Sequence, residues 1–447
     1  DFVDAMAISF AAGFLLWFGT RRHKRELKPR DGFLLVTLAW ILMAAIATLP
    51  LMLLIDGLSF TDAFFETISG LTTTGATVLT GLEKLPPAVN IWRHELNWLG
   101  GMGIIVLAVA ILPLLGVGGM QLYKAETPGP MKDSKLTARI ADTAKALWLV
   151  YFGITLACIL ALKAVGMNWL DAICHAFAAL SLGGFSTYDA SVGQFDSPAI
   201  EAVLIFFMIV AALNFATHYV AWRGRSLKAY WADIEARAVV ALIAVSTLVC
   251  TIYLLARGVY PDFATALRHV AFNLVSIATD CGFASQDYDK WPIFVPLWML
   301  FLSCVTVSSG STGGGIKMIR TLILAQQGLV ELRRLVHPQL VAPLRVGHNA
   351  IPQQIAGAVL GFIFLYILAV GELTFFLIAS GLDFTSAITA IVACINNAGP
   401  GLNVVGPAQN YAALTDFQTW VCSFAMLLGR LEVLSVFVLF TPAFWRR

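Results

Sequence analysis

Apolar runs of about 20 residues recur along this chain, and they constrain its fold more than any other feature. A run of that length crosses the hydrocarbon core of a bilayer as a helix. The clearest runs are Gly32–Leu54, Leu147–Val165, Ala199–Trp222, Ala238–Ala256 and Val359–Ser380. Of the 447 residues, 59% are hydrophobic and only 13% are charged, whereas soluble domains carry about 25% charged residues. The sequence therefore predicts an all-α polytopic membrane protein.

The basic residues gather in groups beside these runs. The groups are Arg21, Arg22, Lys24, Arg25, Lys28 and Arg30; Lys124, Lys132, Lys135 and Arg139; Arg223, Arg225, Lys228 and Arg237; Lys317, Arg320, Arg333, Arg334 and Arg345; and Arg446 with Arg447. The intervening loops carry acidic residues such as Asp189 and Asp287. By the positive-inside rule, the basic loops and the C-terminus are expected in the cytoplasm. Groups that flank apolar runs so regularly argue against nucleic-acid binding.

The first residue is Asp1 rather than Met, and it opens an apolar stretch. We therefore expect one or more helices upstream in a longer protein, and an extra N-terminal helix with a basic loop in residues 1–30. The seven cysteines lie in or beside apolar segments without a CxxC pair. Neither a disulfide framework nor a metal site is predicted.

Four segments of the chain share one pattern, spaced roughly a hundred residues apart. They read FTDAFFETISGLTTTGAT, WLDAICHAFAALSLGGFST, RHVAFNLVSIATDCGFAS and FTSAITAIVACINNAGPGL. Each is a short stretch rich in small residues, then a polar residue, two further residues and a glycine. Aligned on that glycine, the tetrapeptides are Thr72–Gly75, Ser181–Gly184, Thr279–Gly282 and Asn396–Gly399. A single such turn would be unremarkable, but four in register indicate a repeated unit.

Each unit is predicted to hold an outward helix, a re-entrant half-helix with a loop, and an inward helix, because a helix of about ten residues cannot span a bilayer. Irregular backbone at membrane depth survives only when it is buried in protein or lines a watery cavity. Four loops around one axis meet that condition, so we expect a pseudo-four-fold arrangement of repeats around one pore. The expected units are 31–135 (repeat 1), 136–230 (repeat 2), 231–345 (repeat 3, with a broken second helix) and 346–447 (repeat 4).

The four loops are predicted to form a filter for a monovalent cation. Rings of backbone carbonyls replace the hydration shell of such an ion, and glycine adopts the left-handed backbone that aims successive carbonyls at an axis. No carboxylate ring aligns across the repeats, which argues against a divalent-cation site. The predicted filter residues are Thr73, Thr74, Gly75, Leu182, Gly183, Gly184, Asp280, Cys281, Gly282, Asn397, Ala398 and Gly399. The predicted supporting residues are Thr72, Ser181, Thr279 and Asn396.

A glycine-rich break at 308–315 interrupts the third inward helix and predicts an intramembrane gate beneath the filter. A phosphate-binding loop is the alternative, but Ile316 separates Gly315 from Lys317 and apolar spans flank the motif, which argues against it. The predicted gate residues are Gly310, Ser311, Thr312, Gly313, Gly314, Gly315 and Arg430.

Charges inside the last predicted span are functional candidates, since intramembrane charges are costly. Arg430 either approaches the gate loop or joins an ion pair that only fixes packing, with Glu432 in the same span and Glu372 in the preceding helix as candidate partners. Glu66 and His175, each nine residues before its loop glycine, are expected to brace the half-helices by hydrogen bonds.

The motifs TTTGAT (72–77), LGGFST (182–187), SSGSTGGGIK (308–317) and NNAGPGL (396–402) resemble the TrkH subgroup of the TrkH/TrkG/KtrB/HKT superfamily. The resemblance covers essentially the whole chain. It implies K⁺ uptake, with Rb⁺ also accepted, across the bacterial inner membrane by a multi-pass protein embedded in lipid. It further implies a homodimer, a cytosolic TrkA-like nucleotide-binding regulatory partner and a gate approached by Arg430, with no tightly bound organic cofactor. The chain departs from the family pattern at Asp280 and Cys281, and we expect Asp280 to brace the loop rather than face the ion.

Two other function classes agree less well with the sequence than a channel-like pore does. A K⁺/H⁺ or K⁺/Na⁺ symporter is the alternative, but transporters with broken helices usually show two-fold internal repeats, whereas this chain shows four. An enzyme is not predicted, because no HExxH or GxSxG motif is present.

Overall fold

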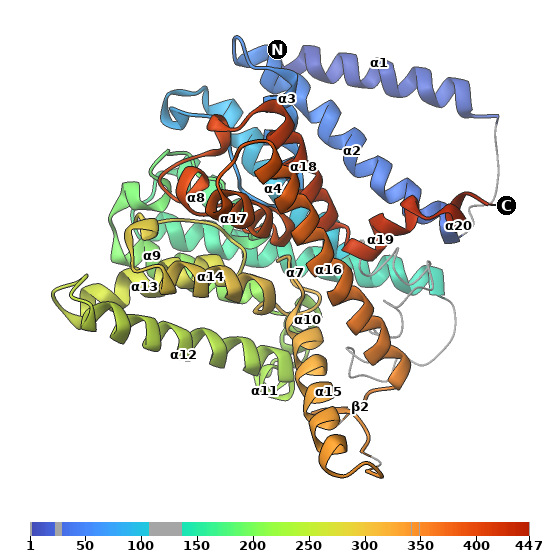
Figure 1. Cartoon of the computed structure of the whole chain (residues 1–447). Coiled ribbons are helices and arrows are strands. Elements are labelled where there is room, and N and C mark those ends of the chain that lie inside the picture. Colours follow the sequence, from blue (N-terminus) through green and yellow to red (C-terminus); the bar gives the residue numbers. More distant parts are fainter. Residues whose placement is uncertain (1, 23–28, 107–135, 341, 348, 447) are drawn as a thin grey trace.

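The computed structural model describes residues 2–22, 29–106, 136–340, 342–347 and 349–446, and nearly all of its regular structure is helical. Seven of the predicted cytoplasmic basic residues lie outside the described residues: Lys24, Arg25, Lys28, Lys124, Lys132, Lys135 and Arg447. Figure 1 shows the helices packed around short central segments, with α15 (Met318–Val336) projecting from one end.

Five helices of the described chain are long and apolar enough to cross a membrane. They are α1 (Phe2–Thr20), α2 (Pro29–Leu54), α7 (Leu136–Ala164), α12 (Ile234–Ala256) and α16 (Gln353–Ala379). Large apolar side chains on their outer faces are exposed, including Phe10 at 75%, Leu149 at 65% and Phe364 at 66%. Such a surface is stable against lipid and not against water, which agrees with the apolar runs of the sequence.

Four shorter helices follow the outward spans of the repeats: α3 (Phe60–Leu71), α8 (Trp169–Ser181), α13 (Phe263–Ala278) and α17 (Phe384–Asn396). Each begins at a polar side chain that accepts a backbone N–H of the first turn, the usual way to start a helix. The capping residues are Ser59, Asn168, Asp262 and Asp383. These helices are too short to span a bilayer, so the predicted re-entrant half-helices are present.

The inward helices are less regular than the sequence predicts. The run Ala199–Trp222, predicted as one span, is instead α9 (Pro198–Ala212) and α10 (Phe215–Gly224), which meet at 99°. The last predicted span is likewise wrong as a continuous helix, because α18 (Asp416–Arg430) and the segment beginning with α19 (Val433–Phe437) meet at 111°. The predicted break of the third inward helix is confirmed between α14 (Phe294–Val305) and α15. In repeat 1, α4 (Pro87–Val106) is continuous as far as it is described.

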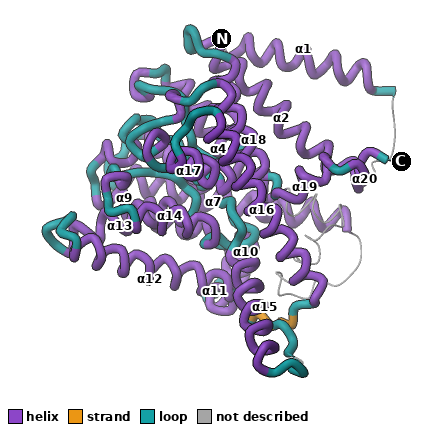
Figure 2. The backbone as a smooth tube through the Cα atoms, in the orientation of Figure 1, coloured by secondary structure: helices purple, strands orange, loops and turns teal. Residues whose placement is uncertain are grey.

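The remaining elements are short. They include helices α11 (Lys228–Ala232) and α20 (Pro442–Trp445). In the part of the chain that the structure describes, six 3₁₀ turns are also present: Leu82–Lys84, Ser191–Phe195, Tyr288–Lys290, Asn403–Val405, Tyr411–Ala413 and Val438–Phe440. Strands β1 (Arg345–Val346) and β2 (Asn349–Ala350) pair antiparallel, with Arg345 opposite Ala350. Figure 2 shows that the loops gather mainly at the ends of the half-helices, opposite the projecting α15.

Two buried apolar clusters hold the four repeats together. One is built mainly from repeats 2 and 3, and the other from repeats 1 and 4. In α8, the fully buried Ala176, Ala178 and Ala179 bring neighbouring helices close. This close approach suits membrane helices, which associate through small residues rather than through the hydrophobic effect. The observed fold is therefore the all-α, four-repeat, pseudo-four-fold architecture, with α1 as the extra N-terminal helix.

Candidate ion pathway

The four half-helices end in the same backbone motif. In each, the residue two before the loop glycine donates its N–H to the carbonyl three residues earlier in the chain. The next residue donates its N–H to the carbonyl five residues earlier, at 2.8 Å. This pair of bonds is a Schellman motif, which requires a left-handed residue just after the helix. The left-handed residues are Thr73 (φ 53°), Leu182 (φ 54°), Asp280 (φ 65°) and Asn397 (φ 59°). Four unlike side chains thus share one conformation that glycine usually supplies.

The four loop glycines, also left-handed, close a ring in chain order. A Cβ built on Gly75 would strike the carbonyl oxygen of Gly183, and one on Gly184 would strike that of Cys281. A Cβ on Gly282 would lie 2.5 Å from the Ala398 carbonyl oxygen, and a Cβ on Gly399 would lie 2.7 Å from the Thr74 carbonyl oxygen. The clashing oxygen belongs in every case to the residue before the glycine of the next repeat. The glycines are therefore required for the ring to close head to tail.

Repeat 1 braces its loop with a buried ion pair. The Arg93 Nε of α4 lies 2.6 Å from the Glu66 Oε1 of α3, and both side chains are about 1% exposed or less. Glu66 accepts hydrogen bonds from the Thr77 hydroxyl and the Val78 N–H of its own loop. Arg93 also donates to the Ser186 carbonyl of repeat 2, at 3.2 Å. The bracing predicted for Glu66 is thus present, and it reaches the neighbouring repeat.

The same half-helix position braces repeats 2 and 3. His175 Nε2 lies 3.0 Å from the Ser186 hydroxyl, which confirms the bracing expected of it. In repeat 3 the corresponding residue is Asn273, which bonds both the N–H and the hydroxyl of Ser285. Repeat 4 uses the neighbouring Thr389, which accepts the N–H of Leu402 at 3.0 Å. The sequence reasoning missed Asn273, although its spacing from Gly282 equals that of His175 from Gly184.

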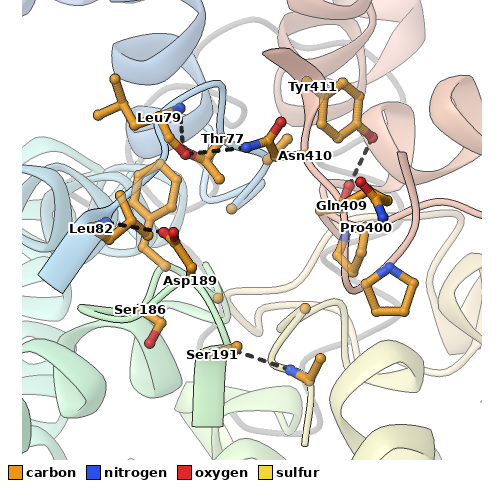
Figure 3. A pocket seen from close by; sticks show the side chains of 18 of the residues that line it. Thr77, Leu79, Leu82, Ser186, Asp189, Ser191, Pro400, Gln409, Asn410 and Tyr411 are labelled. Carbon is orange, nitrogen blue, oxygen red and sulfur yellow. Dashed lines mark hydrogen bonds between the residues drawn. The ribbon is translucent and has the colours of Figure 1, made fainter. Parts of the chain in front are cut away.

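A pocket of about 380 Å³ lies on the outer side of the ring and is lined by all four loop glycines. Figure 3 shows loops of the four repeats on its four sides. Asp189 of repeat 2 accepts the N–H groups of Gly81 and Leu82 of repeat 1, at 2.7 and 3.0 Å. In repeat 4, the Tyr411 hydroxyl donates to the Gly399 carbonyl at 2.9 Å. The Asp189 bonds fix the loop of repeat 1 to that of repeat 2, and the Tyr411 bond fixes the loop of repeat 4 to its following segment.

The predicted supporting residues bond mainly to their own half-helices or loops. Thr72, Ser181 and Thr279 each donate to a carbonyl one turn earlier, at 2.7 Å. Thr72 also pairs with the Thr74 hydroxyl at 2.8 Å. Asn396 differs from the other three, because its side chain crosses to the Tyr366 hydroxyl and the Ser303 hydroxyl.

On the inner side of the ring, three oxygen atoms have no hydrogen-bond partner among the described residues. They are Thr73 Oγ1, Asp280 Oδ1 and Asn397 Oδ1, all on residues that are at most 1% exposed. All three side chains occupy the same loop position, two before the glycine. The other oxygen of Asp280 accepts the N–H of Gly314 at 3.1 Å. Asp280 therefore bonds the gate loop (residues 306–317) with one oxygen.

Ionisable side chains bond backbone groups of three consecutive residues of the gate loop, Thr312, Gly313 and Gly314. The Arg430 guanidinium donates to the Thr312 carbonyl at 2.7 Å, and the Lys317 ammonium donates to the Gly313 carbonyl. Asp280 accepts the N–H of the next residue, Gly314. Because each charge forms a hydrogen bond inside the protein, part of its desolvation cost is offset.

The gate loop also packs closely against the ends of two half-helices that carry the ring. A Cβ on Gly314 would strike the Asn396 carbonyl oxygen, and one on Gly313 would lie 3.2 Å from that of Thr279. On its other side the loop fills the break between α9 and α10. Ser308 N–H donates to the Ala212 carbonyl at 3.0 Å, and Phe215 N–H donates to the Gly310 carbonyl at 3.1 Å. The helix break thus frees backbone groups that the gate loop satisfies.

The partners of Arg430 settle which of its two predicted roles the geometry supports. Its guanidinium donates to the carbonyls of Thr312 and Gly100, at 2.7 and 2.9 Å. Glu432 pairs with Arg320 of α15 instead, at 2.9 Å. Glu372, the other candidate partner, lies on an exposed face of α16. Arg430 therefore forms no ion pair with either candidate partner, and its hydrogen bonds reach the gate loop instead.

Comparison with known proteins identifies the family. The family model TrkH, described as a cation transport protein, matches residues 1–447. This chain belongs to the TrkH family. It is 47% identical over 446 residues to the Trk system potassium uptake protein TrkH of Salmonella typhimurium, covering 100% of this chain and 92% of that protein. It is 39% identical over 447 residues to the Trk system potassium uptake protein TrkG of Escherichia coli, covering 100% of this chain and 91% of that protein.

A solved structure of the TrkH family supports the same conclusion. The crystal structure of the potassium transporter TrkH from Vibrio parahaemolyticus is 44% identical and superposes with a TM-score of 0.91, covering 100% of this chain and 92% of that chain. The protein is accordingly a multi-pass membrane transporter of the TrkH family and not an enzyme. Among the described residues, no group of three or more His, Cys, Asp or Glu side chains is arranged to hold a metal ion.

Proposed function

We propose that this protein takes up K⁺ across the bacterial inner membrane through a channel-like pore at the four-loop ring. The observation that carries the proposal is the head-to-tail closure of the ring by Gly75, Gly184, Gly282 and Gly399. Such a ring places one equivalent carbonyl per repeat around a common axis, which is the chemistry that replaces the hydration shell of K⁺. The half-helices end at this ring, so their partially negative C-termini lie near the ion path.

The proposed ion ligands are the backbone carbonyls of the predicted filter residues. The left-handed residue two before each glycine turns the chain so that the next carbonyl lies at the interface between repeats. Rb⁺, which is close to K⁺ in size, passes through the same ring. The four repeats, with the boundaries expected from the sequence, contribute one loop each.

The gate loop is proposed to close the path on the cytoplasmic side. Its contacts with the Asn396 and Thr279 carbonyls support this role, since an ion leaving the filter would meet Gly313 and Gly314. Opening then requires the loop to move away from the ring. Arg430 restrains the loop through the Thr312 carbonyl.

The proposed assembly is a homodimer regulated by a cytosolic nucleotide-binding partner. The basic residues of the described cytoplasmic loops, such as Arg223, Lys228 and Arg333, support a cytoplasmic position for this face and for the C-terminus. A regulatory partner acting there would lie on the same side as the gate loop.

Flux of ⁸⁶Rb⁺ into proteoliposomes containing the purified full-length protein tests the proposal. Gly184→Ser is expected to abolish the preference for Rb⁺ over Na⁺, because the added Cβ meets the Cys281 carbonyl oxygen. Gly399→Ser should act in the same direction. Gly153→Ser is the matched control, since a Cβ there meets no atom within 4 Å. Unchanged Na⁺ exclusion in both filter variants would refute the filter assignment.

The same vesicles separate a channel from a symporter. Rb⁺ flux driven only by a membrane potential should continue at zero and at reversed gradients of H⁺ and Na⁺. A flux that reverses with either gradient would assign the protein to the coupled class.

A further inference from the structure

One carboxylate bonds both the first part of the gate loop and the start of α15, which follows the loop. Glu235 lies in the first turn of α12 and is 5% exposed. Its Oε1 accepts the backbone N–H of Ser309 at 3.0 Å and that of Ile319 at 2.9 Å. These two amides enclose residues 310–318, which include the part of the loop that contacts the filter. A single oxygen atom of α12, the outward helix of the same repeat, therefore joins the two ends of this segment.

The bond to Ile319 caps the N-terminus of α15, which receives no capping bond from its own N-cap residue. Lys317 precedes α15 with a left-handed backbone (φ 78°), and its side chain makes no capping bond. The first N–H groups of a helix have no partner within it, and they carry partial positive charge. Glu235 provides both an acceptor and a negative charge at that end. The carboxylate thus fixes where the inner half of the third inward helix begins.

The position of Glu235 is set in turn by the cytoplasmic segment before it. Asp233 caps α12 by accepting the N–H groups of Glu235 and Ala236, at 2.9 and 3.2 Å. Its other oxygen accepts the Thr217 hydroxyl of α10 at 2.8 Å. Helix α11, which lies directly before Asp233, contains Lys228 of the basic cytoplasmic group. A displacement of α11 therefore moves the start of α12 and the carboxylate with it.

We propose that Glu235 is a gate-positioning residue that connects Ser309 and Ile319, on either side of residues 310–318, to the α11–α12 junction. Movement of this cytoplasmic junction would then shift the gate loop. The inference rests on the proposed conduction function and adds a route by which a cytoplasmic partner acts on it. Among the described residues, the hydrogen bonds of Arg430 to Thr312 and Gly100 and that of Asp280 to Gly314 include no such connection to the α11–α12 junction.

Basal ⁸⁶Rb⁺ flux through the full-length protein, without any regulatory partner, is the primary test. Glu235→Ala removes both bonds and should raise basal flux at least fivefold, while the Rb⁺/Na⁺ flux ratio stays unchanged because the ring is intact. Glu235→Gln should give an intermediate rise, since it keeps an acceptor oxygen but loses the charge. Basal flux that stays at or falls below the wild-type value in folded Glu235→Gln protein would overturn the proposal.

Glu201→Gln is the matched control. Glu201 is also buried, at 3% exposed, but it pairs with Arg268 in contacts separate from the gate loop. This variant should leave basal flux unchanged. Size-exclusion profile and melting temperature identify variants that fail to fold, and in that event Glu235→Gln decides the outcome.

A second readout does not depend on conduction. Ser311→Cys places a thiol in the gate loop, where Ser311 is 3% exposed. A membrane-permeant thiol reagent should label it several-fold faster when Glu235 is also replaced by alanine, measured against protein with only the native cysteines. Equal labelling rates would overturn the proposal, whereas a wild-type protein that conducts no Rb⁺ would overturn only the proposed function.

The connection to α11 is tested by a double-mutant cycle. Asp233→Ala should raise basal flux by itself, because it releases the cap that positions Glu235. Combined with Glu235→Ala it should add no further increase, since residues acting through one contact are not additive. Multiplicative effects would show that Asp233 and Glu235 act by separate routes, which would overturn the proposed coupling.

Discussion

The most informative single position in each repeat lies two residues before the loop glycine. A left-handed conformation costs an L-residue about 1–2 kcal/mol, yet Thr73, Leu182, Asp280 and Asn397 all adopt it. Asn and Asp tolerate this region better than β-branched or bulky residues, so Thr73 and Leu182 bear the clearest strain. Strain of this kind persists only where the surroundings enforce it, and it concentrates at functional sites. The enforcing contacts here are the Schellman bonds and the closed ring.

Asp280→Asn is predicted to weaken ion entry without releasing the gate loop. Asparagine keeps an oxygen that accepts the Gly314 N–H but removes the negative charge beneath the ring. A unit charge about 10 Å from an ion contributes about 1.7 kcal/mol at an effective dielectric constant near 20. We therefore expect the half-saturating Rb⁺ concentration to rise about 10- to 20-fold at unchanged maximal flux.

The exposed Asp196→Asn provides the control for this experiment, because its carboxylate pairs with Arg268 away from the ring. A change in maximal flux at constant half-saturation would contradict the prediction and assign Asp280 to the gate alone.

At the scale of elements, the gate loop and the broken inward helices depend on one another. Carbonyl groups at the end of α9 lose their helical partners at the bend, and Ser308 and Thr312 of the loop donate to them. An unpaired buried carbonyl costs about 1–3 kcal/mol. A gate that opens by moving this loop must therefore give these groups new partners, so we expect α10 to shift together with the loop.

Arg430→Ala is predicted to raise basal Rb⁺ flux several-fold. The substitution removes the hydrogen bonds to Thr312 and Gly100, and a bond from a charged group contributes about 1.5–3 kcal/mol. Arg430→Lys should give a smaller rise, because a single ammonium group cannot reproduce the two-pronged geometry of the guanidinium. Flux measured without a regulatory partner checks both values. A decrease in flux for the alanine variant would show that Arg430 supports the open state.

The sequence predicted the half-helices, the four loops and the break after α14, because each is a local pattern repeated in register. It did not predict the bend between α9 and α10. No glycine or proline marks Leu213 or Asn214, and the bend is stabilised by a gate loop about a hundred residues later. The role of Lys317 was missed for a related reason, since its partners become visible only when the loop is folded. Such long-range satisfaction of backbone groups leaves no periodic signal.

For the whole molecule, closure of the ring joins two separately packed halves. One apolar cluster belongs mainly to repeats 2 and 3 and the other to repeats 1 and 4. The ring crosses between these halves twice, at the contact of Gly75 with Gly183 and at that of Gly282 with Ala398. The geometry of the filter therefore depends on how the halves dock, and a disturbance of one loop propagates to its neighbour.

Serine substitution at each of the four glycines should give a graded loss of selectivity. The clashes at Gly184 and Gly75 are tighter than those at Gly282 (2.5 Å) and Gly399 (2.7 Å), and every clashing atom is a backbone oxygen that cannot rotate away. All four glycines also have positive φ, so each serine adds conformational strain. We expect the Rb⁺/Na⁺ flux ratio to fall most for Gly184→Ser and Gly75→Ser, and least for Gly399→Ser. Equal losses of the Rb⁺/Na⁺ flux ratio at all four positions would contradict this order. They would show that the backbone strain common to the four glycines outweighs the differences in contact between repeats.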